Sequence, residues 1–176
     1  RPAAGAIPIG DEPQLKIANQ PLLMVGIMAA SLIQILDTTI ANVAIPHMQN
    51  SLGATAESVT WVLTSYIIAS AVAMPVTGWL ADRVGARRLF IWSVAGFIVT
   101  SMLCGMAQTL EQMVAFRILQ GAVAGPLIPV SQTLLLASYP PQKAGLALAL
   151  SGMTTLVAPV AGPLLGGWIT DNISWP

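Results

Sequence analysis

The sequence predicts an all-α integral membrane protein, a bundle of transmembrane helices, and three observations support that fold class. Of its 176 residues, 55% are hydrophobic and 8% are charged, whereas soluble domains carry about 25% charged residues. The mean hydropathy is +0.75, which is too apolar for a coiled coil or a disordered chain. Apolar stretches of about 20 residues, long enough to cross a hydrocarbon core of about 30 Å, recur along the chain. A water-soluble globule is therefore excluded.

The chain divides into a polar N-terminal segment and five predicted spans. Residues 1–20 are rich in Pro, Gly and Ala and are expected to form a flexible cytoplasmic tail, because the long span behind them argues against a signal peptide. Residues 21–176 are expected to form a partial N-terminal transmembrane bundle, with a sixth span and a C-terminal bundle missing, since an odd number of spans indicates a piece of a longer polypeptide. The predicted spans cover residues 22–45, 59–81, 89–107, 112–136 and 145–169.

Basic residues set the predicted orientation, because short cytoplasmic loops retain Lys and Arg. Apart from one arginine inside a span, they fall on one side of the predicted bundle: Arg1, Lys16, Arg83, Arg87, Arg88 and Lys143. The opposite loops hold Glu57, Glu111 and Asp171 and no basic residue. The sequence therefore places the N-terminus in the cytoplasm and the end of the fifth span outside.

Two ionisable residues lie well inside spans, Asp37 in the first and Arg117 in the fourth. Uncompensated charge at that depth costs about 2.5 to 3.5 kcal/mol or more, so both must face protein or water. Both lie a similar distance from the outer ends of their helices, which predicts that they meet in the outer half of the membrane. Burial favours the neutral acid and a nearby guanidinium favours the carboxylate, so their separation can decide whether Asp37 holds a proton. The alternative is a static ion pair, and for intramembrane acids the functional role is favoured.

Polar side chains accompany both of these charges. Gln34 lies three residues before Asp37, and Gln120 lies three residues after Arg117, so each shares a helix face with its charged neighbour. Together the four residues predict a polar stripe on two facing helices. In the second span, Tyr66 can present its ring or its hydroxyl to a cavity, and a packing role is the alternative.

The loop between the second and third spans, residues 78–90, holds an acid, a glycine and three arginines in a short segment. Gly85 permits a tight turn there. Asp82 can cap the third helix or pair with an arginine. The arginines can equally serve only to fix the topology.

The fifth span is distinguished by small residues and prolines. Small residues at four-residue spacing allow another helix to approach closely. Pro159 and Pro163 each remove a backbone donor, and two such breaks four residues apart predict a bend at a moving interface. The residues predicted to form this bend are Pro159, Gly162, Pro163, Gly166 and Gly167.

Two pairs of segments indicate an inverted internal repeat. Residues 35–49, ILDTTIANVAIPHMQ, align without gaps to residues 118–132, ILQGAVAGPLIPVSQ. The segment GWLAD at the end of the second span resembles GWITD at the end of the fifth. Both pairs relate a span to the third span after it, which crosses in the opposite direction, as an inverted three-plus-three repeat predicts.

Metal, thiol and nucleic-acid chemistry are not indicated. One Cys and one His cannot supply the ligands of a metal or iron–sulfur site, so no metal and no cofactor are expected. Seven basic and seven acidic residues cancel, which leaves no positive field for nucleic acid. An embedded enzyme would need a nucleophile–base pair that the spans do not offer. The expected partners are lipid, small molecules and other membrane proteins.

Four motifs resemble, in order, signatures of the major facilitator superfamily and of its 14-span drug:proton antiporters. LDTTIANVAIP at residues 36–46 is similar to their first-span signature. GWLADRVGARR at residues 78–88 is similar to the loop signature of the superfamily, with Ala86 where a basic residue is usual. FRILQGAVAGP at residues 116–126 resembles the fourth-span signature, and APVAGPLLGG at residues 158–167 resembles a fifth-span motif typical of antiporters.

The resemblance implies a multi-pass protein of the bacterial inner membrane, a multidrug efflux antiporter that expels hydrophobic toxic compounds in exchange for protons by alternating access. The proton gradient would be the energy source, and a periplasmic adaptor protein and an outer-membrane channel would be partners. Asp37 and Arg117 would be the proton-coupling pair. The substrate cavity would be lined by Gln34, Thr38, Tyr66 and Gln120. The cytoplasmic gate would comprise Gly78, Asp82, Arg83, Gly85, Arg87 and Arg88, and the fifth-span bend would be the antiporter motif.

Two other functions stay open at this point. An uptake permease of the same fold would share the loop signature and would have less use for the fifth-span motif. A non-transporting scaffold or receptor built on the same bundle predicts that Asp37→Asn leaves cellular drug resistance unchanged. Proton coupling predicts that this substitution abolishes resistance while the protein still inserts.

Overall fold

The computed structural model describes residues 20–172, apart from a few side chains near helix ends, and every regular element in that range is a helix. The predicted tail lies outside the described residues except for Gln20, and so does the end of the chain after Asn172. The helices are α1 (Gln20–Leu52), α2 (Ala56–Val84), α3 (Ala86–Gly105), α4 (Leu110–Ala124), α5 (Leu127–Ser138) and α6 (Pro141–Asn172).

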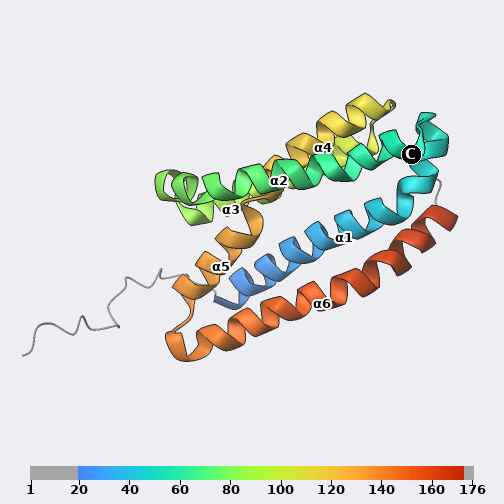
Figure 1. Cartoon of the computed structure of the whole chain (residues 1–176). Helices are drawn as coiled ribbons and strands as arrows, with labels where there is room; N and C mark the ends of the chain where they lie inside the picture. Colours follow the sequence, from blue (N-terminus) through green and yellow to red (C-terminus); the bar gives the residue numbers. More distant parts are fainter. Residues whose placement is uncertain (1–19, 173–176) are drawn as a thin grey trace, which may run out of the picture.

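The helices form two groups joined by α5 (Figure 1). In one group α2 packs chiefly on α4, and α3 packs on α4 and α5. In the other group α1 and α6 run side by side, and α6 is the main neighbour of α1. The first and fourth spans, which carry the two intramembrane charges, therefore come from different groups.

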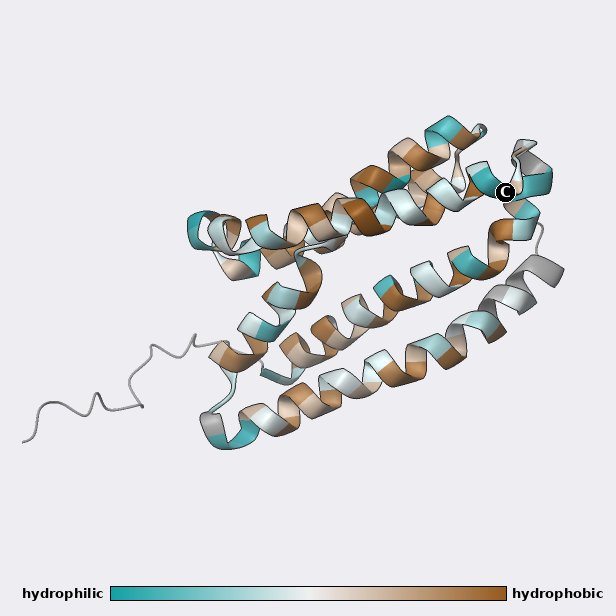
Figure 2. Cartoon of the chain, in the orientation of Figure 1, coloured by the Kyte–Doolittle hydropathy of each residue, from teal (hydrophilic) through white to brown (hydrophobic). Residues whose placement is uncertain are grey.

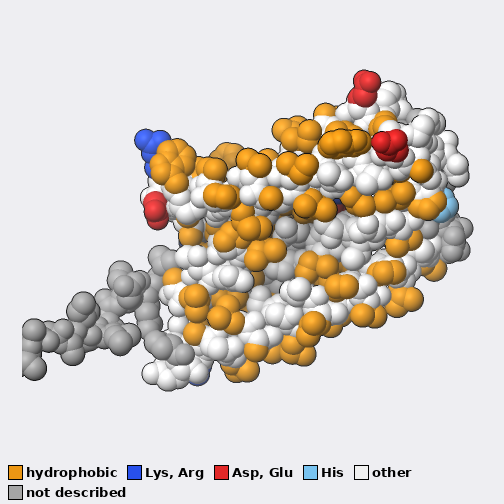
Figure 3. Space-filling view, viewed as in Figure 1, with side chains coloured by type: hydrophobic (Ala, Val, Ile, Leu, Met, Phe, Trp, Pro, Cys, Tyr) orange, Lys and Arg blue, Asp and Glu red, His pale blue; other side chains and the backbone are white. Residues whose placement is uncertain are grey.

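Five segments of the described chain are long and apolar enough to cross a membrane, which confirms the predicted number of spans. The first two helices extend beyond the predicted bounds, over 33 and 29 residues, whereas the third ends at Gly105, two residues before its predicted end. Large apolar side chains on the outside are typical of lipid-facing surfaces, and Leu156, Leu164 and Trp92 are each more than 70% exposed. Apolar side chains cover the visible flank, while charged and hydrophilic ones gather toward the ends (Figures 2 and 3).

The fourth predicted span, residues 112–136, lies within one membrane-length segment, Leu110–Ser138, which consists of two helices. The helix ends at Ala124 and a second one begins at Leu127, with Gly125 and Pro126 forming a turn between them. The physical reason is that Pro126 has no backbone N–H to continue the helical ladder and its ring crowds the preceding turn. The fourth span is therefore two shorter helices, α4 and α5, of different direction (Figure 1).

Short polar signals define the ends of the helices. Thr55 and Ser58 form a capping box at the start of α2, in which each side chain bonds the backbone N–H of the other. Thr109 accepts a hydrogen bond from the N–H of Gln112 at the start of α4. Gly85 joins α2 to α3 with φ +90°, a backbone conformation that favours glycine.

Glycines let α2 and α4 approach closely. A Cβ on Gly121 would collide with the carbonyl oxygen of Tyr66 and lie 2.9 Å from Cβ of Ala69. A Cβ on Gly125 would lie 2.7 Å from the carbonyl oxygen of Ser70. Only a residue without a side chain fits at either place, so these glycines set the distance between the two helices.

Candidate functional site

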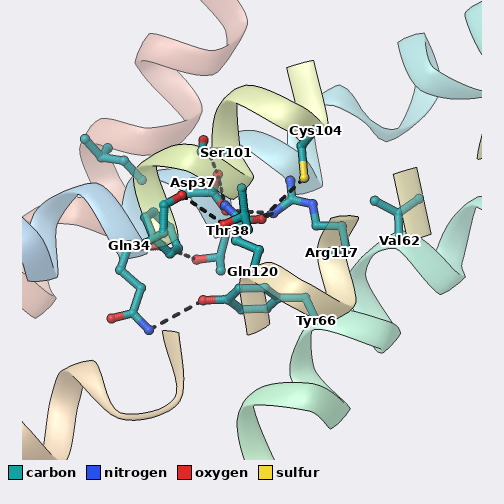
Figure 4. Close-up of polar contacts among 12 residues, drawn as sticks. Gln34, Asp37, Thr38, Val62, Tyr66, Ser101, Cys104, Arg117 and Gln120 are labelled. Carbon is teal, nitrogen blue, oxygen red and sulfur yellow. Dashed lines mark hydrogen bonds and ion pairs between the residues drawn. The ribbon is translucent and has the colours of Figure 1, made fainter. Parts of the chain in front are cut away.

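The centre of the bundle holds an ion pair between α1 and α4. Nη1 of Arg117 donates a hydrogen bond to Oδ2 of Asp37 across 2.6 Å. The side chain of Arg117 is 6% exposed and that of Asp37 is 15% exposed. The two charges therefore meet, as the sequence predicts, and neither is left uncompensated in the bundle. Figure 4 shows them side by side.

Gln120 completes the ion pair by binding both partners. Its Nε2 donates to Oδ1 of Asp37 at 3.1 Å, and its Oε1 accepts from Nη1 of Arg117 at 2.9 Å. The residue is fully buried. An amide can act in this way because it carries both donors and an acceptor. Gln120 thus holds the carboxylate and the guanidinium in one geometry.

The third helix contributes two residues that sequence reasoning missed. The hydroxyl of Ser101 donates to Oδ1 of Asp37 at 3.5 Å, and the thiol of Cys104 donates to Oε1 of Gln120 at 3.7 Å. Both are long contacts of modest strength. Their spacing of three residues places them on one face of the helix. That spacing does not identify α1 and α4 as the helices they contact.

The guanidinium of Arg117 is only partly satisfied. Its carbon lies 5.9 Å from the centre of the Tyr66 ring, within the range of a cation–π contact. Its Nε is buried and has no hydrogen-bond partner in the described part of the chain. An arginine with an unpaired buried donor is held less firmly than one whose five N–H groups are all bonded. The pair can therefore be opened at a lower cost than a fully satisfied one.

Gln34 and Tyr66 lie beside the ion pair and connect it to the break in the fourth span. Nε2 of Gln34 donates to the hydroxyl of Tyr66 and to the backbone carbonyl of Ala124, each at 3.4 Å. Ala124 is the last residue of α4 before the turn at Gly125 and Pro126. The side chain of Gln34 thus contacts α2 and the end of α4 at once (Figure 4).

A cavity of about 530 Å³ lies next to Gln34, between α1, α5 and α6. No charged residue lines it. Its polar lining consists of Ser31, Gln34, Ser131, Gln132, Ser151 and Thr155. Its apolar lining includes Ile35, Ile128, Leu136 and Leu148.

Of the four residues expected to line a substrate cavity, Gln34 lines this one. Tyr66 and Gln120 are buried in the polar cluster around the ion pair instead. Thr38 bonds the carbonyl oxygen of Ile35 on its own helix at 2.9 Å. The tilt and rotation of the helices decide which of these side chains reach the cavity.

The loop between α2 and α3 contains the residues expected to form the cytoplasmic gate. Asp82, Arg83, Arg87 and Arg88 are all exposed. Within residues 20–172 Asp82 forms no ion pair, and Gly85 rather than Asp82 is the N-cap of α3. The expected cap or pair at Asp82 is therefore absent from the described part of the chain. Arg83 lies over the ring of Trp79, 4.9 Å from its centre.

The residues of the expected fifth-span bend lie in α6, which continues through Pro159 and Pro163 without leaving the helical conformation. Gly162 faces α1, where an added Cβ would overlap the side chain of Thr39. An added Cβ on Gly167 meets nothing within 4 Å. Gly78, at the start of the loop motif, also has open space around it. Of these glycines, Gly162 is thus the one that the packing of α6 on α1 requires.

Five membrane-length segments and a buried ion pair in the described chain define a multi-pass α-helical membrane protein with two charges inside the bundle. The sequence profile of the Major Facilitator Superfamily matches residues 27–176. The chain belongs to this superfamily. Its relatives place it among bacterial multi-pass membrane proteins.

Several bacterial proteins are similar to the chain over most of its length. The multidrug export protein EmrB of Haemophilus influenzae is 55% identical over 154 residues, which are 88% of this chain and 30% of the relative. The fatty acid resistance protein FarB of Neisseria gonorrhoeae is 53% identical over 94% of this chain and 32% of its own length. EmrB of Escherichia coli K12 is 49% identical over 92% of this chain and 31% of its own length. The chain therefore spans about a third of the length of these relatives.

Proposed function

We propose that the whole protein exports hydrophobic compounds across the bacterial inner membrane in exchange for protons, and that Asp37 and Arg117 couple the two movements. The observation that carries this proposal is the buried ion pair between α1 and α4, bridged by Gln120. An acid inside a membrane bundle costs free energy, so such residues are rare and usually functional. Proton transfer is one of their common functions. Relatives named for multidrug export and for fatty acid resistance support the direction and the apolar nature of the substrate.

The proton step uses the atoms of the ion pair. In the arrangement described here, Asp37 accepts hydrogen bonds from Arg117 and Gln120. Transfer of a proton to one carboxylate oxygen makes the acid neutral and removes the attraction that holds Arg117 2.6 Å away. The helices α1 and α4 are then free to separate, and loss of the proton on the other side of the membrane restores the pair. The other titratable side chains near Asp37 are Arg117 on α4, Tyr66 on α2 and Cys104 on α3.

Alternating access needs surfaces that move, and two features of the chain fit that role. Gly162 lets α6 pack closely on α1, and Pro159 and Pro163 leave carbonyl groups of α6 without helical donors. The exposed arginines between α2 and α3 are available to contact the remainder of the protein at the cytoplasmic face. We place the N-terminus in the cytoplasm, because the basic residues of short loops collect at that end.

The proposed energy source is the proton gradient, without a cofactor. The proposed partners are a periplasmic adaptor protein and an outer-membrane channel, which would carry the compound past the periplasm. This part of the proposal rests on the resemblance to the drug:proton antiporters and can be tested by crosslinking the whole protein in cells.

The test of the proposed function is export by the Asp37→Asn variant of the whole protein. Asparagine keeps the size of the side chain and cannot release a proton at physiological pH. We expect proton efflux driven by drug addition, measured in proteoliposomes with a pH-sensitive dye, to fall to background. The matched control is Glu57→Gln, which neutralises an exposed acid in the first turn of α2 and should leave transport unchanged. Export that survives Asp37→Asn would refute the coupling role and favour a scaffold or receptor, and proton-driven uptake would favour a permease.

A further inference from the structure

A groove runs along the outside of the α2–α4 pair, on a different face of α4 from the ion pair. One hollow of about 710 Å³ and a second of about 360 Å³ share Trp61, Val114 and Ile118 in their linings, so they form one continuous space, the α2–α4 groove. Ile118 is 47% exposed, whereas its neighbour Arg117 is buried and bonds α1. None of the residues in the polar cluster around the ion pair lines this groove.

The close packing of α2 on α4 gives the groove its floor. Gly121 and Gly125 bring the backbone of α4 against α2. The lining residues beside these glycines carry only a methyl group and are Ala69, Ala73 and Ala122. The side chains on either side are larger and exposed, as Val72 is on α2 and Ile118 is on α4, so the floor is recessed between them.

The wall of the groove offers a ligand almost no polar group. The hydroxyl of Thr77 donates to the carbonyl oxygen of Ala73 at 3.1 Å, and the hydroxyl of Ser65 donates to that of Val62 at 3.4 Å. All other residues that line the larger hollow are apolar or aromatic. No lysine or arginine lines either hollow. The wall therefore suits a hydrocarbon chain.

The groove is also long and narrow. Along α2 it runs from Trp61 to Leu80, about 28 Å at about 1.5 Å per residue, which approaches the thickness of a hydrocarbon core, about 30 Å. The larger hollow of about 710 Å³ therefore has a mean cross-section of about 25 Å², a fraction of that of a helix about 10 Å across. An extended acyl chain fits such a space better than another helix does.

A carboxylate stands at one mouth of the groove. Glu111 lines that mouth in the first turn of α4, and it forms no hydrogen bond or ion pair with any other described residue. Trp61 lines the same mouth, is 56% exposed, and carries an indole N–H that can donate. Acidic side chains are visible at the end of the bundle where α2 and α4 begin (Figure 3). The charge at this mouth is complementary to a cationic group.

We propose that the α2–α4 groove binds one phospholipid with a primary ammonium headgroup, phosphatidylethanolamine, whose ammonium pairs with Glu111 and whose acyl chain lies between α2 and α4. An ammonium donates charge-assisted hydrogen bonds to a carboxylate, whereas a quaternary ammonium has no N–H to donate and an anionic headgroup is repelled. In the orientation given under the proposed function, Glu111 lies at the outer face, so the lipid belongs to the outer leaflet. One leaflet supplies about 15 Å of the core, so the chain reaches from Trp61 to about Val72.

The first experiment tests the headgroup. The whole protein, delipidated in detergent, is titrated with phosphatidylethanolamine, phosphatidylcholine and phosphatidylglycerol of identical chains, and bound lipid is counted by native mass spectrometry. We expect one tight site whose Kd for phosphatidylethanolamine is about 2- to 5-fold lower than for phosphatidylcholine, the effect of an exposed ion pair. Glu111→Gln should bind the two lipids equally. Glu57→Gln is the matched control, because that acid lies at the same end of the bundle and does not line the groove, and it should keep the preference.

The second experiment tests the place of the chain. Ala122→Phe puts a ring into the groove from an exposed position, and we expect the Kd for all three lipids to rise about 10-fold or more. Ala95→Phe is the matched control, because that exposed alanine of α3 lines neither hollow, and its Kd should equal that of the wild type. The unfolding midpoint in lipid-free detergent should be the same for both variants. If Ala122→Phe proves less stable, the headgroup preference of Glu111→Gln decides.

The following outcomes would overturn the lipid site. Equal Kd values for phosphatidylethanolamine and phosphatidylcholine in the wild type, tighter binding of phosphatidylglycerol, or unchanged binding by Ala122→Phe would each refute it. A wild type that retains no lipid, together with a lower lipid-free midpoint in Ala122→Phe than in Ala95→Phe, would show that a protein segment fills the groove instead. Neither experiment alters Asp37 or Arg117, so the proposed proton coupling stands or fails separately.

Discussion

Nη1 of Arg117 lies 2.6 Å from Oδ2 of Asp37, although 80 positions separate the two residues in the sequence. The contact joins α1 to α4, and hence joins the two groups of helices across the centre of the bundle. Because both side chains are largely buried, each depends on the other for compensation of its charge. The ion pair of Asp37 and Arg117 therefore contributes to the packing of the bundle and also to its proposed proton chemistry.

The ion pair predicts strong coupling between substitutions at its two members. Arg117→Met leaves the carboxylate of Asp37 without its cation, and we expect a loss of about 3 to 5 kcal/mol in the free energy of unfolding. Combining it with Asp37→Asn removes the stranded charge and should recover part of that loss. Denaturation of the whole protein in detergent, followed for the wild type, both single variants and the double variant, measures the coupling. Additive effects would show that the pair is not an energetic unit.

Gly121 predicts a steric effect between α4 and α2. In Gly121→Ala the new methyl group collides with the carbonyl oxygen of Tyr66 and crowds Ala69, so the helices must separate. We expect a loss of about 1 to 3 kcal/mol, measured as a lower midpoint of thermal unfolding. Gly26→Ala is the control, because that glycine of α1 has nothing within 4 Å of the added Cβ. Equal unfolding midpoints for Gly121→Ala and Gly26→Ala would contradict the close approach of α4 to α2.

The contact between Gly162 and Thr39 predicts that Thr39→Gly restores stability lost in Gly162→Ala. Gly162→Ala places a methyl group on the side chain of Thr39, which should separate α6 from α1 and reduce export by the whole protein. Thr39→Gly removes the obstructing atoms, so the double variant should regain stability relative to Gly162→Ala. The readouts are thermal unfolding and drug resistance of cells. A double variant that is worse than either single one would argue against this contact.

Gly85 and Gly78 belong to the same loop motif and predict opposite outcomes. Gly85 adopts φ +90°, so Gly85→Ala should cost about 1 to 3 kcal/mol through backbone strain at the turn between α2 and α3. Gly78 lies within helical α2 and an added Cβ there meets nothing, so Gly78→Ala should not destabilise the fold. Any loss of transport in Gly78→Ala with an unchanged unfolding midpoint would then report a contact made at the cytoplasmic gate.

The spans, the meeting of the two charges and the close-packing Gly162 of the fifth span could be predicted from the sequence. Each of these depends on local chemistry: an apolar segment of sufficient length must span, and an intramembrane charge must find a partner. The position of the break in the fourth span could have been read from Pro126 as well, but a proline can also sit within a continuous helix, as Pro75 does in α2. The coupling role of Asp37 and Arg117 stays a prediction.

The contacts of Ser101, Cys104 and Gln120, and the cavity beside Gln34, could not be predicted in the same way. Residues that are neighbours on one helix face need not point at the same partner, since tilt and rotation in a bundle are decided by packing against all neighbouring helices. Hydropathy and charge by themselves thus determined how many times the described chain crosses the membrane and which charges must pair. Only the tertiary structure decided which neutral side chains surround that pair and where a space stays open, because those outcomes depend on the mutual fit of several helices at once.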